Sequence, residues 1–480
     1  MFFRAGHGGG TRLPEEVRLL PGTELKTNVE ELVRHMPGDV IWPHDASYDT
    51  ARALAMPRVD PRPLAIVRPR TAEDVGAVVG SLVGEGVPFA VRGGGHSPAA
   101  LAGGDGTVLI DMRGMKGLRL DVRNRIADAE AGLTAGEYTE AAALHGMATS
   151  FGDTPSVGIT GLTLGGGVGF LSRRYGLTID DLLAADVVTA DGRLVHASQD
   201  SHPDLFWALR GGGGNFGVVT RLRFALQEVP EVYGGTLVMP ATPQTVHGTV
   251  ASSLAAPDGL TNIIMLMRAP PLPFLPEESH GKPILIVKGC FAGSQADGEA
   301  AMSPLRALSE PLLDAFATMP YPSLLEEPPG PPINARFATC FRDSWDEPTA
   351  AAAVAAVDQP GHGLRTVQIR PLGGAISRVP VDATAFAHRE RNLMVNLGCS
   401  FGSPPDEPSA EQWLQDTRDA LAEGEGSFTS FLDDWAPGSV PDAYPNGAWE
   451  RLRRVKREYD PHNVFRSNHN VPPAEEVASA

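Results

Sequence analysis

Apolar residues follow two alternating periods in the first part of the chain. Residues 64–67 form a short apolar run, and residues 71–74, Thr-Ala-Glu-Asp, have the Thr-x-x-acid form of a helix capping box. Behind this box, valines and leucines recur at every third or fourth residue as far as Gly84, which predicts one buried face of a helix. Residues 87–91 form a second apolar run. Strand, helix and strand in this order predict an α/β unit, and α/β folds bind ligands at the carboxyl ends of their strands.

Further strands and helices are predicted up to about Pro230. A second capping box at residues 134–137 begins a helix that we expect to run to about Met147. The Asp-Gly pair at 191–192 lies between two apolar runs and predicts a tight hairpin. Residues 218–226 alternate between apolar and polar, which predicts a strand that closes this region.

The pattern changes from about Glu231 onward. Longer apolar runs at 283–288, 364–369 and 392–399 alternate with helical patterns and proline-rich loops. They predict an antiparallel sheet with helices on one side, and residues 448–459 predict a basic amphipathic helix. Because 480 residues exceed the size at which a single core keeps growing, we expect a two-domain α+β chain.

Composition excludes several classes of partner. The chain has 40 Lys and Arg against 58 Asp and Glu, a formal net charge of −18, so its field repels phosphate backbones and anionic lipid. We therefore expect neither nucleic acid nor a membrane as a partner. The N-terminus has no apolar core of signal-peptide length, which predicts a cytoplasmic protein. Its 3 cysteines lie far apart and have no zinc-site spacing, so no metal is expected.

The segment with the clearest chemical meaning is VRGGGHS, residues 91–97. Three consecutive glycines let the backbone approach a flat or anionic ligand, and His96 supplies a nucleophilic nitrogen beside them. Alone, this heptad could equally be a glycine turn with a surface histidine. A second glycine series, FGDTPSVGITGLTLGGGVGF at 151–170, and a polar C-terminal segment, YDPHNVFRSNHNVPP at 459–473, favour a ligand site.

In this order, the three segments resemble the covalent-flavin oxidases of the vanillyl-alcohol-oxidase (PCMH) fold, in particular the berberine-bridge-enzyme-like branch. The resemblance covers roughly residues 60–230 and resumes at 372–389 and 450–473. It implies an α+β fold in which an FAD-binding domain faces a substrate domain of antiparallel sheet covered by helices. The implied segments are 1–230 for the FAD-binding domain, 231–439 for the substrate domain and 440–480 for a C-terminal return to the FAD-binding domain.

The resemblance also implies how FAD is held. The histidine after the glycine triplet bonds to the flavin's 8α-methyl group in this family, and His96 occupies that place. Bicovalent members carry a cysteine before the proline that matches Pro155; here that residue is Thr154, so we expect no cysteinyl link. Val157 stands where a small residue admits dioxygen, which favours an oxidase. The residues expected to contact FAD are Arg92, Gly93, Gly94, Gly95, His96, Ser97, Thr154, Pro155, Val157, Gly158, Gly161, Gly165, Gly166, Gly169, Val219, Asn468 and Asn470.

The catalytic base is not identified by the resemblance. Plant relatives have a glutamate where this chain has Arg378, and many relatives have a tyrosine where it has Phe428. An arginine near the flavin could instead hold an anionic substrate or a phenolate. Packing or surface solvation is as good an explanation as catalysis for every remaining candidate. These candidates are Tyr444, Tyr321, Gln368, Arg370 and Asn396.

The resulting functional expectation is an FAD-linked oxidase, a monomer or a homodimer. It would take a hydride from a small secondary-metabolite alcohol, phenol or amine and pass electrons to O2, giving H2O2. A flavin-dependent monooxygenase, a dehydrogenase and a non-catalytic flavin-binding protein remain alternatives. A serine hydrolase would depend on Ser400 alone, in a G-x-S-x-G motif whose following residues, 403–406, do not suit a helix start. The G-x-G-x-x-G at 212–217 precedes a predicted strand, which argues against a Rossmann site.

Overall fold

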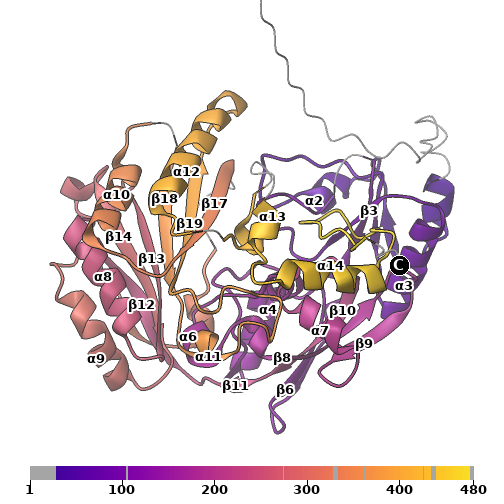
Figure 1. The fold of residues 1–480 in the computed structure, drawn as a ribbon, viewed down its shortest axis with the longest axis horizontal. Helices are drawn as coiled ribbons and strands as arrows, with labels where there is room; N and C mark the ends of the chain where they lie inside the picture. The colour runs from indigo at the N-terminus through magenta and orange to yellow at the C-terminus, as the bar shows by residue number, and fades with distance from the viewer. Residues whose placement is uncertain are drawn as a thin grey trace, which may run out of the picture.

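The structure, a computed structural model, describes residues 29–103, 106–273, 275–327, 333–361, 363–424, 426–433 and 439–475. Figure 1 shows two groups of elements side by side, one built from the early residues with the yellow C-terminal helix and one built on a large sheet of middle residues. No helix in these ranges combines the length and apolar character needed to cross a membrane.

A four-stranded sheet in the order β1-β2-β4-β3 begins the fold. Strands β2, β4 and β3 are parallel, and α3 connects β2 to β3, as the sequence pattern predicts. The capping box is present, because the Thr71 side chain accepts a hydrogen bond from the Asp74 backbone N–H at 3.1 Å. The triple glycine therefore follows directly from the carboxyl end of β3. The bounds are Asp39–Ile41 (β1), Ala65–Arg68 (β2), Ala72–Gly84 (α3), Phe89–Arg92 (β3) and Val108–Asp111 (β4).

A five-stranded antiparallel sheet, in the order β5-β6-β10-β8-β9, packs beside the first. The predicted Asp-Gly hairpin joins β8 to β9, with Gly192 at a φ of +76°. Helix α4 (Ala135–Ala143) ends before Met147, contrary to expectation, because Gly146 turns the chain at a φ of +66°. Residues Met147–Ala148 instead form β7. The sheet's bounds are Leu118–Asp121 (β5), Ile126–Glu130 (β6), Leu182–Val188 (β8), Leu194–Ser198 (β9) and Val218–Ala225 (β10).

The middle of the chain forms an eight-stranded sheet in which every strand pairing is antiparallel. Its main path is β15-β12-β14-β13-β18-β19-β17, and β16 pairs with β12. This confirms the predicted α+β fold class. The bounds are Val232–Pro240 (β12), Leu260–Arg268 (β13), Pro283–Phe291 (β14), Leu313–Asp314 (β15), Ala317–Met319 (β16), Ala335–Arg342 (β17), Arg365–Pro371 (β18) and Leu393–Ser400 (β19).

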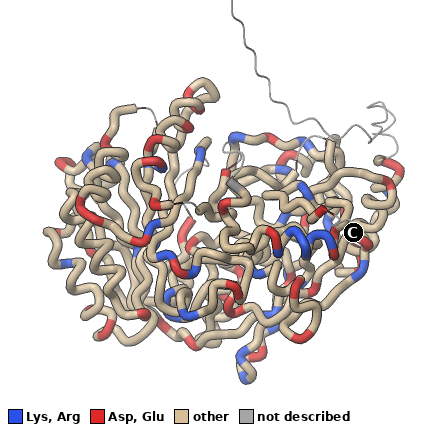
Figure 2. The backbone as a smooth tube through the Cα atoms, viewed as in Figure 1, with Lys and Arg blue, Asp and Glu red and all other residues tan. Residues whose placement is uncertain are grey.

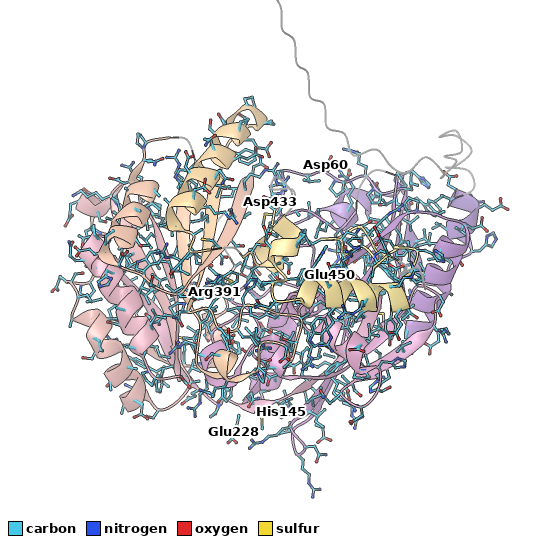
Figure 3. All side chains as sticks on the ribbon, in the orientation of Figure 1. Asp60, His145, Glu228, Arg391, Asp433 and Glu450 are labelled. Atoms are coloured by element: carbon cyan, nitrogen blue, oxygen red, sulfur yellow. The ribbon has the colours of Figure 1, made fainter. Side chains whose placement is uncertain are left out.

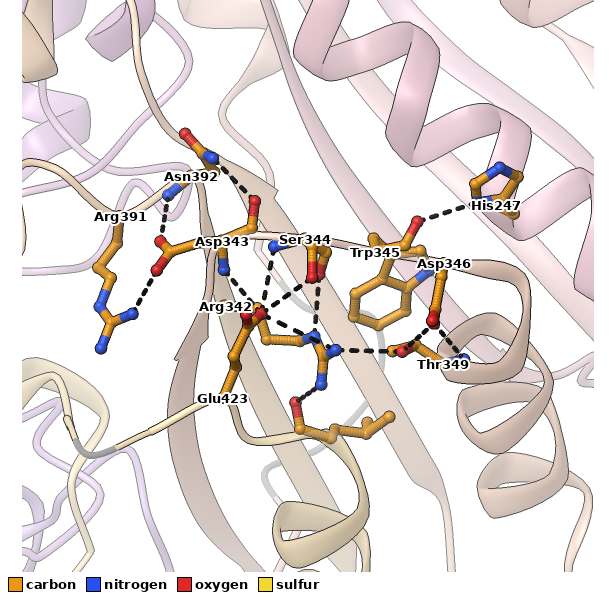
Figure 4. Close-up of polar contacts among 11 residues, drawn as sticks. His247, Arg342, Asp343, Ser344, Trp345, Asp346, Thr349, Arg391, Asn392 and Glu423 are labelled. Atoms are coloured by element: carbon orange, nitrogen blue, oxygen red, sulfur yellow. Dashed lines mark hydrogen bonds and ion pairs between the residues drawn. The ribbon is translucent and has the colours of Figure 1, made fainter.

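Helices cover one face of this large sheet (Figure 1). Alternate strand residues such as Leu266, Leu285 and Val395 pack against the helices in one core, so their neighbours face the other way. Asp346 caps α10 by accepting the Thr349 backbone N–H at 2.9 Å (Figure 4). The covering helices are α8 (Pro243–Ala255), α9 (Gln295–Arg306), α10 (Glu347–Asp358) and α12 (Glu407–Leu421).

The C-terminal helix returns to the early part of the chain. Helix α14 has the predicted bounds, Ala448–Tyr459, and carries the run of basic residues marked blue in Figure 2. It buries Leu452 and Val455 in the core that contains α7 (Pro203–Leu209). Its buried Lys456 donates to the Asn215 carbonyl at 2.8 Å and pairs with Asp460 at 2.7 Å.

Asp433 joins the two groups of elements. Its fully buried carboxylate accepts hydrogen bonds from Arg58, in the early region, at 2.6 Å and from Arg336, on β17, at 2.8 Å. Figure 3 shows this residue between the two groups. The domain limits at 230 and 439 stay a prediction, and residues 1–28 and 476–480 lie outside the described residues.

Candidate active site

A cavity of about 1370 Å³ lies between the loops that follow β3 and the uncovered face of the eight-stranded sheet. Pockets for single drug-sized ligands measure roughly 300–1,000 Å³, so this one has room for more than one small molecule. Its wall combines the glycine triplet, helix α5 (Ile159–Gly165), the start of β10 and Asn468 with residues of six long strands of the large sheet.

His96 projects into this cavity from the end of β3. Its Nε2 lies 3.0 Å from Ser156 Oγ, and that hydroxyl lies 2.9 Å from Glu327 Oε2. Burial lowers the pKa of His96 below its ordinary value, against the opposing effects of the Glu327 charge and a hydrogen bond to the Ser156 backbone. The imidazole is therefore neutral at neutral pH, and one ring nitrogen keeps a lone pair that can act as a nucleophile.

The glycines around His96 occupy positions where a side chain is disfavoured for different structural reasons. A Cβ added to Gly94 would lie 2.3 Å from the Gly158 backbone nitrogen, so these two loops touch backbone to backbone. A Cβ added to Gly161 would meet no atom within 4 Å, and both this residue and Gly93 line the cavity. Gly95 has a φ of +78°, which disfavours any side chain. The open space beside Gly161 is a cradle for a ligand that fills the cavity.

Buried polar atoms without partners also lie at this end of the cavity. The Arg92 guanidinium donates to Asp111 at 2.7 Å and to the Ala51 carbonyl at 2.5 Å, but its Nε and Nη1 have no partner. Asn468 Oδ1 is likewise unpaired. Unpaired cationic donors beside glycine backbone suit an anionic group such as a pyrophosphate. The residues present therefore fit FAD.

The other expected FAD contacts separate into two sets. The cavity wall includes Ser97, Thr154, Val157, Gly158, Gly165 and Val219. Four expected contacts are absent from the wall, and packing within the protein explains two of them. A Cβ on Gly169 would lie 1.6 Å from the Phe151 carbonyl oxygen, and one on Gly166 would lie 2.9 Å from the Phe386 ring. The four residues outside the wall are Pro155, Gly166, Gly169 and Asn470.

Gln368 is the expected catalytic candidate that faces the cavity from the sheet. Its Oε1 accepts hydrogen bonds from Arg370 Nε at 2.9 Å and from Asn396 Nδ2 at 3.1 Å. The amide NH2 of Gln368 is therefore directed away from these donors and available to a ligand. Arg370 and Asn396 lie behind the wall and hold this orientation.

The two expected tyrosines do not supply a base. Tyr321 is fully buried and does not line the cavity, so the structure does not place it where it could contact a ligand there. Tyr444 lines the cavity but donates to the Gly211 carbonyl at 3.3 Å, and burial raises its pKa further above 10. Arg378 is exposed and pairs with Asp258 at 2.5 Å. At neutral pH neither phenol is an efficient proton acceptor.

The sequence did not single out four polar residues of the wall. Asp153 pairs with Arg370 at 2.7 Å; burial raises the pKa of this carboxyl, but the charge and hydrogen bond of Arg370 lower it to a net value below normal. Lys288 on β14 pairs with Glu326 at 2.7 Å. Glu327 approaches Ser156 from a distant loop, and no local pattern marks that contact. Asp153 stands one residue before Thr154, so the second glycine series did carry a signal for it.

The sheet side of the cavity is strongly apolar. Its residues alternate with those of the helix-covered core, as the period of a strand requires. Apart from Lys288, Gln368, Gly398, Cys399 and small hydroxyl residues, the strands present apolar side chains here. The larger of these side chains are Val238, Ile263, Met265, Met267, Ile284, Ile286, Leu313 and Phe337.

Residues of the G-x-G-x-x-G and G-x-S-x-G motifs, among them Gly214 and Ser400, line the cavity. A strand, β10, follows the G-x-G-x-x-G, which confirms the argument against a Rossmann site. Ser400 Oγ accepts the Leu364 backbone N–H at 2.7 Å, as a turn serine does. The expectation that no helix starts after it is wrong, since Pro404–Asp406 form a 3-10 turn and α12 follows; proline suits the first turn of a helix.

Comparisons with known proteins agree with this geometry. Residues 63–198 match the FAD binding domain model, and residues 432–472 match the model described as berberine and berberine like. The FAD-linked oxidoreductase YvdP of Bacillus subtilis is 31% identical over 92% of this chain and 99% of its own length. Xylooligosaccharide oxidase of Thermothelomyces thermophilus is 29% identical over 93% of this chain and 95% of its own length.

A solved structure shares the fold. The crystal structure of 6-hydroxy-D-nicotine oxidase from Arthrobacter nicotinovorans has a TM-score of 0.82 at 26% identity, covering 92% of this chain and 98% of that one. The fold and the cavity define an enzyme of the FAD-linked oxidoreductase class. The chain belongs to the berberine-bridge-enzyme-like family of FAD-linked oxidases with the vanillyl-alcohol-oxidase fold.

Proposed function

We propose that this enzyme holds FAD through a single covalent bond to His96 and oxidises an apolar alcohol, phenol or amine. The observation that carries the proposal is one continuous cavity that joins the neutral His96 imidazole to an apolar sheet face. The single link is supported by Thr154, which has no sulfur, and by Cys290 and Cys340, which are buried outside the cavity wall; Cys399 lines the sheet side of the cavity.

The substrate class follows from the sheet side of the cavity. One relative named above acts on xylooligosaccharides and another on a hydroxynicotine. Sugar hydroxyls need many hydrogen-bonding partners, and burying them unpaired is costly. The aliphatic wall formed by residues such as Met265 and Ile286 offers few such partners, so it favours a compact apolar molecule over a saccharide.

Three side chains would bind and orient the polar group of the substrate and accept its proton. The Gln368 amide donates to the substrate oxygen or nitrogen, and Arg370 fixes both Gln368 and Asp153. The ionised Asp153 carboxylate accepts the proton of the substrate hydroxyl or ammonium. Bound FAD supplies the hydride acceptor and the route of electrons to O2, which becomes H2O2.

Substrate turnover tests this proposal. Aryl and terpenoid alcohols and amines should release H2O2 in a one-to-one ratio with product, whereas xylobiose should give none.

Asp153→Asn should lower kcat about 100-fold, within the usual range for a general base, and abolish the acidic limb of the pH profile. Asp258→Asn is the matched control, because Asp258 is half-buried and lies outside the cavity wall. Product formed without peroxide would contradict an oxidase and indicate the monooxygenase or dehydrogenase alternative.

A further inference from the structure

His96, Ser156 and Glu327 form a chain of hydrogen bonds that runs from the cavity to the surface. The Nε2 to Oγ distance is 3.0 Å and the Oγ to Oε2 distance is 2.9 Å. The Ser156 backbone N–H also donates to Glu327 Oε1 at 2.8 Å, so both carboxylate oxygens face this serine. His96 and Ser156 are half-buried, and Glu327 is exposed.

The direction of these hydrogen bonds determines the tautomer of His96. An ionised carboxylate can only accept, so the Ser156 hydroxyl donates its single proton to Glu327. The same oxygen must then accept from His96, which places the imidazole proton on Nε2 and the lone pair on Nδ1.

We propose that Ser156 and Glu327 are positioning residues for cofactor attachment: they make Nδ1 of His96 the atom that bonds to the flavin and carry the imidazole proton away. This inference rests on the proposed histidyl link and adds the groups that produce it. A hydroxyl and a carboxylate in series activate a nucleophile in the same way that a base oriented by a third group does elsewhere.

The reaction balances with O2 as the oxidant. Nδ1 forms a bond to the 8α-methyl carbon, which loses one hydrogen, and the imidazole loses the proton on Nε2. That proton moves to Ser156 Oγ as the serine proton moves to Glu327, and the exposed carboxylate releases it to water. The two electrons of the broken C–H bond reduce the isoalloxazine and then O2, which takes up two protons to give H2O2.

The rate of covalent FAD attachment tests this role of Ser156 and Glu327, which we call the proton relay, separately from substrate turnover. Apoprotein from riboflavin-limited cells is mixed with FAD, and flavin fluorescence in the acid-precipitated pellet is followed over time. Ser156→Ala and Glu327→Gln should attach FAD about 100-fold more slowly than the unaltered protein, as expected for loss of a general base, while still binding FAD without a covalent bond. Ser156→Thr, which keeps the hydroxyl, should attach FAD at close to the normal rate.

Glu299→Gln is the matched control, because it removes the same charge from an exposed residue of α9 that lies outside the cavity wall and accepts from Gln295 at 2.7 Å. It should attach FAD normally. Normal attachment in both Ser156→Ala and Glu327→Gln, or a linkage at Nε2 in the isolated flavin peptide, would overturn the relay and leave the histidyl link intact. Unaltered protein without pellet-bound flavin would instead refute the link itself.

Discussion

At the scale of single residues, the glycines of neighbouring loops differ in the reason why a larger side chain would be unfavourable at their positions. Gly94 and Gly158 have none of the space that a side chain needs, because each backbone lies against the other. Gly161 has space, but that space belongs to the cavity. Substitution at these sites should therefore damage different properties, the fold in the first case and ligand binding in the second.

Gly161→Ala should weaken FAD binding without destabilising the apoprotein. Alanine in helix α5 costs less conformational entropy than glycine, but its methyl group would occupy the ligand's space. An extra methyl group in a packed contact costs about 1–3 kcal/mol, so the Kd for FAD should rise about tenfold or more. The Kd is measured in a His96→Ala background, where binding is reversible.

Gly80→Ala, on helix α3, is the control, since a Cβ there also meets no atom within 4 Å but lies away from the cavity wall. It should leave the Kd for FAD unchanged. An equal Kd for the Gly161 and Gly80 variants would mean that FAD does not lie against α5.

At the scale of elements, a buried carboxylate supports the junction between strands. Asp181 precedes β8 and accepts from Gln227, on β11 (Gln227–Glu228), at 2.7 Å and from the Ser150 backbone N–H at 3.3 Å. Burial raises the pKa of this carboxyl to about 7, partly offset by those hydrogen bonds. The folded protein therefore binds this proton more tightly than the unfolded chain does.

Asp181 should make the fold less stable as pH rises. Its folded pKa lies above the unfolded value, so its contribution to stability is complete below the unfolded pKa near 4 and is lost between pH 4 and about 7. Each unit of pKa shift corresponds to about 1.4 kcal/mol. Melting temperatures at pH 5 and pH 8 should show a larger fall for the unaltered protein than for Asp181→Asn. Parallel curves would contradict the assignment.

Local sequence patterns predicted elements well where short-range chemistry decides them. The capping boxes, the Asp-Gly hairpin and helix α14 all lie where the residues indicate. The end of α4 was placed too late because the positive φ at Gly146 overrides the helical pattern. The contact between Ser156 and Glu327 spans 171 residues, and no local rule foretells it.

At the scale of the whole molecule, the cavity requires the early region and the eight-stranded sheet to stay together. Strand order in that sheet, with β18 between β13 and β19, depends on long-range pairing that periodicity does not reveal. The resemblance to a known family supplied what the local pattern could not. Asp433 is one of the residues that joins the two parts, through Arg58 and Arg336.

Asp433→Asn should loosen this junction. Removing one partner of a buried ion pair costs about 3–5 kcal/mol, because the other charge loses its counterion. Arg58 loses the carboxylate it pairs with, whereas Arg336 still pairs with Glu407 and Glu411. The melting temperature should fall by several degrees, and less FAD should become attached, because the cavity is less often intact. Asp60→Asn removes an exposed carboxylate that pairs with the buried Arg52, and it should change neither, because Arg52 still pairs with Asp49. Equal effects of the two variants would show that Asp433 does not hold the junction.

The most direct measurement is acid precipitation of the purified protein, followed by flavin fluorescence of the washed pellet. The account predicts that the unaltered protein keeps its yellow colour in the pellet. The His96→Ala variant should release all its flavin into the supernatant. A colourless pellet from the unaltered protein, or a yellow one from the variant, would contradict the claim that His96 tethers FAD.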